Sequence, residues 1–153
     1  WDTYETAALE AGRNPDRADY KVARSIFLAD TTPEAQQLAR SNSLGANYEY
    51  IGRLFDKGLG RKIYKRDLEM PDSECNLDFL MTEQIIAGDV DTVLERLLGL
   101  WEETGGFGTL VLMSYDWDDK ASWVRSMELF AAHVMPALKP LGEPRAKRKR
   151  ARK

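Results

Sequence analysis

Apolar positions in the second half of the chain follow two alternating periodicities. Short apolar runs, such as Thr109-Leu-Val-Leu-Met-Ser, stand between stretches in which apolar residues recur every three or four positions. The first pattern is typical of a buried strand and the second of an amphipathic helix. The sequence therefore predicts a strand at 83–87, a helix at 90–104, a strand at 108–114 and a helix at 119–138.

The first half shows the same alternation before it becomes irregular. It predicts a helix at 2–11, a turn at 12–19, a strand at 20–29 and a helix at 32–41, whose start is marked by Thr31, Pro33 and Glu34. Residues 42–82 are too long for an ordinary β/α connection and are predicted to be irregular and partly helical. This insertion carries several aromatic residues, so we expect it to form a mobile cover over the substrate side.

Continuously apolar strands separated by helices indicate an α/β fold with parallel strands and helices on both faces of the sheet. In such folds the chemistry lies at the carboxyl ends of the strands. Here those ends are Gly88 with Asp89, and the run Ser114-Tyr-Asp-Trp. We therefore expect a ligand site above the last strands.

Five segments, in order along residues 1–141, carry a family resemblance. They are Gly12-Arg-Asn-Pro-Asp-Arg, Arg24-Ser-Ile-Phe-Leu-Ala-Asp-Thr-Thr-Pro-Glu-Ala, Ile86-Ala-Gly-Asp-Val-Asp-Thr-Val, Gly105-Gly-Phe-Gly-Thr-Leu and Arg125-Ser-Met-Glu-Leu-Phe-Ala-Ala-His-Val-Met-Pro. Together they resemble the bacterial luciferase-like flavin-dependent monooxygenases, including the limonene monooxygenase-like branch. The resemblance implies the C-terminal half of a (β/α)8 TIM-type barrel. Such barrels take about 250 residues, so we expect this chain of 153 residues, which opens at Trp1 inside a helical pattern, to be an incomplete fragment.

The resemblance also implies the chemistry. Members of this family use reduced FMN, supplied by a separate flavin reductase, and dioxygen to oxygenate a small apolar or carbonyl substrate. We expect a cytoplasmic homodimer when the protein is full length, with the catalytic residues in the missing N-terminal half. Two alternatives stay open, namely a deazaflavin-dependent oxidoreductase of the same fold, and a noncatalytic interaction fragment.

The strongest candidate site residues follow the last strand. The Ser114 hydroxyl and the Tyr115 and Trp117 rings stand where a barrel places ligand-contacting groups, and a flat flavin ring suits aromatic contact. Alternation places Tyr115 and Trp117 on one side. Asp116 or Asp118 is expected to cap the next helix.

Two further candidates carry competing explanations. Amides at Gly88 could hold a phosphate, whereas Asp89 favours a plain helix cap. Arg24 shares a strand side with Val22, Ile26 and Leu28, and there it would meet either a carboxylate partner, which we favour, or an anionic group of the cofactor. We expect that side to point into the barrel.

The remaining features narrow the function classes. No apolar run is long enough to span a bilayer. Cys75 and His133 are each the only residue of their type, which argues against zinc clusters and a histidine-based triad, and we expect the first to be inert and the second structural. Net charge is −3, yet Arg145–Lys153 holds seven basic residues, so residues 142–153 are predicted to be a disordered basic tail that binds nucleic acid only nonspecifically, if at all.

Overall fold

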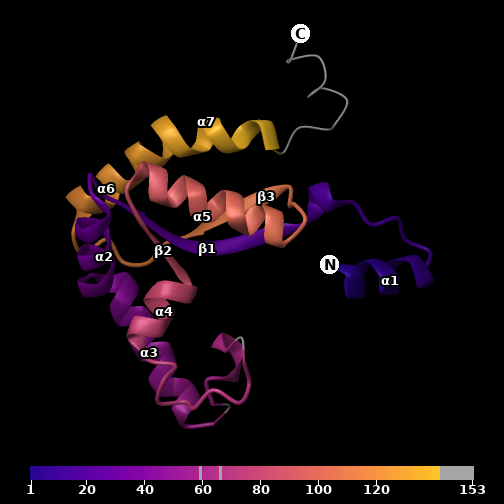
Figure 1. Cartoon of the computed structure of the whole chain (residues 1–153), viewed down its shortest axis with the longest axis horizontal. Helices are drawn as coiled ribbons and strands as arrows, with labels where there is room; N and C mark the ends of the chain where they lie inside the picture. Colours follow the sequence, from indigo (N-terminus) through magenta and orange to yellow (C-terminus); the bar gives the residue numbers. More distant parts are fainter. Residues whose placement is uncertain (59, 66, 142–153) are drawn as a thin grey trace.

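A three-stranded parallel sheet forms the centre of the molecule (Figure 1). The computed structural model describes residues 1–58, 60–65 and 67–141. The strands are β1 (Lys21–Leu28), β2 (Ile85–Gly88) and β3 (Thr109–Met113), in the order β2-β1-β3. The predicted α/β class and the parallel arrangement are confirmed.

The two outer strands pair with different halves of β1. β2 lies beside its carboxyl half, from Ser25 opposite Ile85 to Leu28 opposite Gly88. β3 lies beside its amino half, from Lys21 opposite Thr109 to Ser25 opposite Met113. β1 therefore separates the two strands that follow it, which differs from the consecutive strand order that the barrel expectation implies.

Helices cover both faces of the sheet, as predicted. One face, here called the α5 face, carries Ile26, Leu28 and Ile86 and packs against α5 (Val90–Glu103) and the closing helical segment. The opposite face, here called the Ser25 face, carries Ser25, Phe27 and Ile85 and packs against α2 (Thr32–Ser41) and the insertion. Figure 1 shows α5 and α7 on one side of the strands and α2, α3 and α4 on the other.

The insertion is more regular than predicted. It contains α3 (Ser43–Asp56), the 3-10 turn η2 (Lys62–Tyr64) and α4 (Leu77–Glu83). Asn42 and Asn76 cap the two α-helices through their side-chain oxygens. The predicted strand start at Glu83 is wrong, because that residue ends α4 and the strand begins two residues later.

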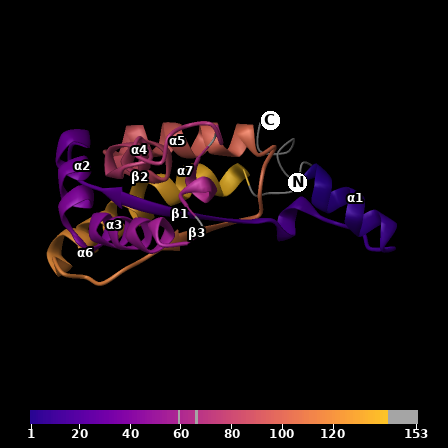
Figure 2. The same cartoon turned by 90° about the horizontal axis from the view of Figure 1, so that it is seen from below.

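The closing helix is continuous but not α-helical throughout. α6 (Lys120–Leu129) runs into a π-helical turn, η3 (Phe130–Val134), and then into α7 (Met135–Leu138) and the 3-10 turn η4 (Lys139–Leu141). At the other terminus, α1 (Asp2–Glu10) and the 3-10 turn η1 (Arg17–Asp19) precede β1, and α1 lies apart from the sheet (Figure 2).

Within the described part of the chain, no helix combines the length and hydrophobicity needed to cross a bilayer. The basic tail predicted at 142–153 lies outside the described residues.

Candidate functional site

The loop that follows β3 carries three of the predicted site residues. Trp117 donates its indole N–H to the hydroxyl of Ser114 over 2.9 Å. Its ring stacks on that of buried Trp123, with centroids 6.5 Å apart and planes inclined by 5°. Trp117 nevertheless remains 44% exposed. The loop therefore presents a fixed, partly accessible aromatic surface at the carboxyl end of the sheet.

Tyr115 is tied into a chain of hydroxyl groups on the Ser25 face. The Ser25 hydroxyl lies 3.2 Å from the Tyr115 hydroxyl and 3.2 Å from that of Tyr48 on α3. Ser25 is completely buried, and burial raises the pKa of Tyr48 to about 12. Tyr48 is thus a neutral phenol at physiological pH. Ser25 was not among the predicted site residues, although a serine inside an apolar strand indicates a buried hydroxyl that needs a partner.

The insertion holds the same loop from a second direction. The backbone N–H of Ser43, at the start of α3, donates to the Asp118 carboxylate over 2.8 Å, and the Ser43 hydroxyl donates to the carbonyl oxygen of Asp116. Burial opposes ionisation of Asp118, but hydrogen bonds from Trp123 and Ser43 hold its pKa below the usual value. The prediction that Asp116 or Asp118 caps the next helix is wrong, because Asp119 caps α6.

Next to the loop, the part of the Ser25 face that β3 forms is exposed to solvent. Val111 and Met113 on β3 pair with β1 residues of that face and are 42% and 43% exposed. Above them, the face is covered by apolar and aromatic residues of the insertion, namely Leu44, Tyr48, Tyr64, Met70, Phe79 and Leu80. The loop, the buried hydroxyl chain and this apolar strip form our candidate site.

Gly88 and Asp89 form a closely packed helix start. The Asp89 carboxylate accepts the Thr92 N–H over 2.9 Å, and the Asp89 N–H donates to the Thr32 hydroxyl over 3.1 Å. A Cβ at Gly88 would lie only 2.7 Å from the Thr92 side chain. The backbone N–H groups of Asp89 and Thr92 therefore already have partners within the chain. This agrees with the alternative that Asp89 is a helix cap.

Arg24 lies away from the other candidates. It shares its strand side with Ile26 and Leu28, as alternation predicted, but that is the α5 face. There it lines a pocket with Glu83, Arg96 and Glu103, and its guanidinium donates to the Ala23 carbonyl over 2.8 Å. The expectation that this side of the strand points into a barrel interior stays a prediction, because the described strands form an open three-stranded sheet with helices on both faces. The assignment of Arg24 to the cofactor stays a prediction.

The single cysteine and histidine lie outside the site. Cys75 is fully buried, and burial raises the pKa of its thiol despite nearby Arg61 and Lys65. His133 is exposed on η3. Among the described residues, no group of three or more histidine, cysteine or acidic side chains is arranged to hold a metal ion.

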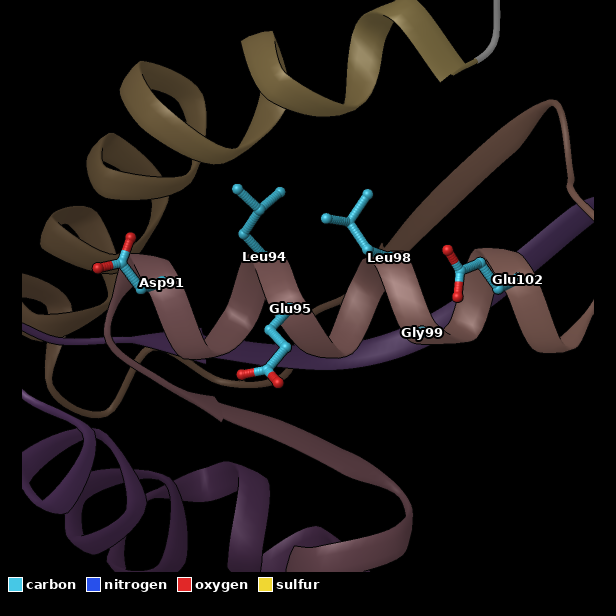
Figure 3. A pocket seen from close by; sticks show the side chains of 6 residues that line it. All are labelled: Asp91, Leu94, Glu95, Leu98, Gly99 and Glu102. Carbon is cyan, nitrogen blue, oxygen red and sulfur yellow. The ribbon is translucent and has the colours of Figure 1, made fainter.

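A surface hollow along α5 offers no alternative centre. All six residues that line it come from this one helix: Asp91, Leu94, Glu95, Leu98, Gly99 and Glu102. Figure 3 shows Leu94 and Leu98 pointing toward the closing helices, while Glu95 points the other way. Their polar groups do not converge, so the hollow lacks the arrangement typical of a ligand site.

Comparison with known proteins points to one class of enzyme. No protein-family model matches the chain. The chain is 35% identical over 140 residues to 3,6-diketocamphane 1,6-monooxygenase from Pseudomonas putida, covering 90% of this chain and 37% of that protein. It is 24% identical over 137 residues to limonene 1,2-monooxygenase from Rhodococcus erythropolis, covering 89% of this chain and 33% of that protein.

A solved structure shows the same similarity in three dimensions. It is a type II Baeyer-Villiger monooxygenase from Pseudomonas putida, the oxygenating constituent of 3,6-diketocamphane monooxygenase, in complex with FMN. The TM-score is 0.78 at 36% identity, over 89% of this chain and 38% of that one. The chain thus spans little more than a third of the proteins it resembles, and those proteins are monooxygenases.

Proposed function

We propose that this chain is part of an FMN-dependent, luciferase-like monooxygenase that oxygenates a small apolar or carbonyl compound. The observation that carries the proposal is similarity over nine-tenths of the chain, in sequence and in fold, to a monooxygenase whose structure contains FMN. The higher identity to the diketocamphane enzyme than to limonene 1,2-monooxygenase favours the former branch. The proposal includes three properties of the complete protein. It forms a closed barrel, it is a homodimer, and it receives reduced FMN from a separate flavin reductase.

The loop after β3 fits one part of FMN, its flat ring. Trp117 is fixed on one side by Trp123 and by Ser114, and 44% of it stays exposed. An accessible, immobilised indole suits the largely apolar face of an isoalloxazine. We therefore assign ring or substrate contact to Trp117 and Tyr115, with Ser114 orienting the indole.

The phosphate of FMN does not fit the helix start at Gly88. The Asp89 and Thr92 amides are both satisfied by side chains of this chain, and the Asp89 carboxylate would repel a phosphate at the same place. We therefore expect the phosphate contacts elsewhere, most of them on the earlier strands of the barrel, as the family resemblance implies.

In the reaction, the cofactor supplies oxygen activation once it is reduced, and the protein supplies position and shelter. When FMN is bound, Trp117 and Tyr115 would contact its ring and orient it. The insertion places apolar side chains over the Ser25 face, and this excludes water from the reacting atoms. Val111 and Met113 offer an apolar strip against which a hydrocarbon substrate can pack.

The proposal is tested on the complete protein with reduced FMN, a flavin reductase with its nicotinamide donor, and a bicyclic ketone under 18O2. We expect FMN-dependent product that carries one atom of the labelled oxygen. Omitting FMN, or replacing it with a deazaflavin, is expected to abolish the product. Absence of FMN binding, or equal turnover with the deazaflavin, would overturn the proposal.

A further inference from the structure

The insertion helix α3 is connected to the loop after β3 at two places, once directly and once through a residue of β1. Its first residue, Ser43, binds the loop at Asp116 and Asp118. Tyr48, about one and a half helical turns further on, reaches Tyr115 through Ser25 of β1. Three segments distant in the sequence therefore meet at one buried hydroxyl group.

Ser25 connects the two tyrosines through its hydroxyl group. A serine hydroxyl has one proton to donate and can accept through its oxygen, so it can satisfy both phenols at once. Its neighbours along β1, Ile26, Phe27 and Leu28, are apolar and buried, so packing alone gives no reason for a hydroxyl there. Both oxygen–oxygen distances are 3.2 Å, so these are long hydrogen bonds between hydroxyl groups.

We propose that Ser25 is a positioning residue, which fixes the Tyr115 ring at the mouth of the site and couples it to Tyr48 of the insertion. The inference rests on the proposed function, because it gives Tyr115 a role only if the loop lines the FMN or substrate pocket. Ser25 itself does not contact the reacting atoms. It acts through Tyr115, so the two side chains form one unit.

A double-variant cycle in the complete protein tests this coupling. Ser25→Ala, Tyr115→Phe and the combined variant are compared for the dissociation constant of FMN and for the KM and kcat of the ketone. Each single change is expected to weaken FMN or substrate binding about 3- to 10-fold, the effect of one lost hydrogen bond. The combined variant is expected to be no weaker than the more affected single variant, because both changes break the same contact.

Ser126→Ala is the matched control. Ser126 is also buried, and its hydroxyl accepts the backbone N–H of Leu28 on the same strand, but it touches neither tyrosine. It is expected to lower the melting temperature and to leave the FMN constant and the KM within about twofold. If its effects on binding equal those of Ser25→Ala, or if the effects of Ser25→Ala and Tyr115→Phe multiply, the positioning role is refuted.

A second readout separates this inference from the proposed function. Near-ultraviolet circular dichroism of the flavin-free protein reports aromatic rings held in a fixed environment, and Tyr115→Leu identifies the contribution of the Tyr115 ring. Ser25→Ala is expected to weaken that contribution, whereas Ser126→Ala is expected to leave it unchanged. An unchanged band in Ser25→Ala contradicts the positioning role whether or not the wild-type protein binds FMN, and failure of the wild-type protein to bind FMN contradicts only the proposed function.

Discussion

Trp117 carries the most exposed aromatic surface of the candidate site, and its surroundings define what its removal should do. The Trp117 ring stacks on Trp123 and donates a hydrogen bond to Ser114. Because Trp117 is 44% exposed, it contributes little to the buried core. In the complete protein we expect Trp117→Ala to weaken FMN binding or shift substrate preference by about 1–3 kcal/mol, the scale of a lost aromatic contact, with the fold intact. Flavin titration and competition between two ketones measure the change.

Trp123→Phe serves as the comparison, since Trp123 is buried and packs on Phe27. It should lower the melting temperature more than Trp117→Ala does. If Trp117→Ala lowers the melting temperature alone and leaves flavin affinity and turnover unchanged, Trp117 is a packing residue and the site assignment is wrong.

Tyr48 gives a prediction about pH. Burial raises its pKa from 10.0 to about 12, so the folded protein holds the phenolic proton more tightly than the unfolded chain. The stabilisation is complete below pH 10 and is lost as the pH rises from about 10 to 12. Over that range the wild-type free energy of unfolding should fall by about 2 kcal/mol relative to Tyr48→Phe, which lacks the titrating group. Urea unfolding of both proteins at several pH values between about 9 and 12 measures this difference. If Tyr48 were solvated, the free energies of unfolding of the two proteins would change with pH in the same way.

At this scale, alternation predicts which side chains share a face but not what covers that face. It correctly groups Arg24 with Ile26 and Leu28, yet only the structure shows that α5 covers this face. Alternation along β1 likewise places Ser25 on the opposite face, beside the candidate site. Its role depends on Tyr48 and Tyr115, 23 and 90 residues away in the chain, which local pattern cannot bring together.

Between elements, the junction of β2 and α5 is a tight contact that a single methyl group can test. A Cβ at Gly88 would lie 2.7–2.8 Å from two atoms of Thr92. Gly88→Ala should therefore destabilise the protein by about 1–3 kcal/mol through overpacking. Gly99→Ala is the matched control, because a Cβ there meets nothing within 4 Å and alanine favours the helix, so stability should rise by up to about 1 kcal/mol. Denaturant unfolding measures the change in the free energy of unfolding for both variants. Equal changes would contradict the packing described for Gly88.

The insertion provides a second prediction at this scale. Its helices α3 and α4 pack on the core, whereas the described residues between them, 57–58, 60–65 and 67–76, form mainly turns and a 3-10 helix. In the complete protein we expect amide hydrogen exchange between residues 57 and 76 to slow when FMN and substrate bind, with α3 protected in both states. Equal protection of this segment with and without ligands would remove its assignment as a mobile cover.

Helix caps made the starts of α2 and α5 predictable. Thr31 caps α2 and Asp89 caps α5, as expected from their positions before apolar, helix-spaced residues. Residues 42–82 were predicted to be irregular and partly helical because of their length, without bounds for the helices. The Asn42 cap, followed by Leu44, Tyr48 and Phe55 at helical spacing, was the signal for α3.

For the molecule as a whole, the order β2-β1-β3 could not be predicted from the periodicity. Strand and helix patterns indicate a parallel sheet, but the pairing of β3 with β1 depends on how α5 crosses the sheet. β3 has one paired edge among the described strands, and Val111 and Met113 are exposed beside it. Both features leave apolar surface and strand edge open in the isolated chain.

We therefore expect isolated residues 1–153 to have negligible monooxygenase activity and weak affinity for FMN. Unpaired strand edges and uncovered apolar residues favour self-association or a partly molten state. Sedimentation and near-ultraviolet circular dichroism measure both properties. A monomeric, rigid 1–153 that bound reduced FMN tightly and turned over would falsify this expectation.

A crystal structure of the complete protein with FMN tests the central claim most directly. We predict that the flavin ring lies at the carboxyl end of β3, in van der Waals contact with Trp117 or Tyr115, with Ser25 still bonded to Tyr115 and the phosphate held mostly on the earlier strands of the barrel. A flavin ring bound elsewhere, with the loop 114–118 open to solvent and touching neither cofactor nor substrate, would contradict the account.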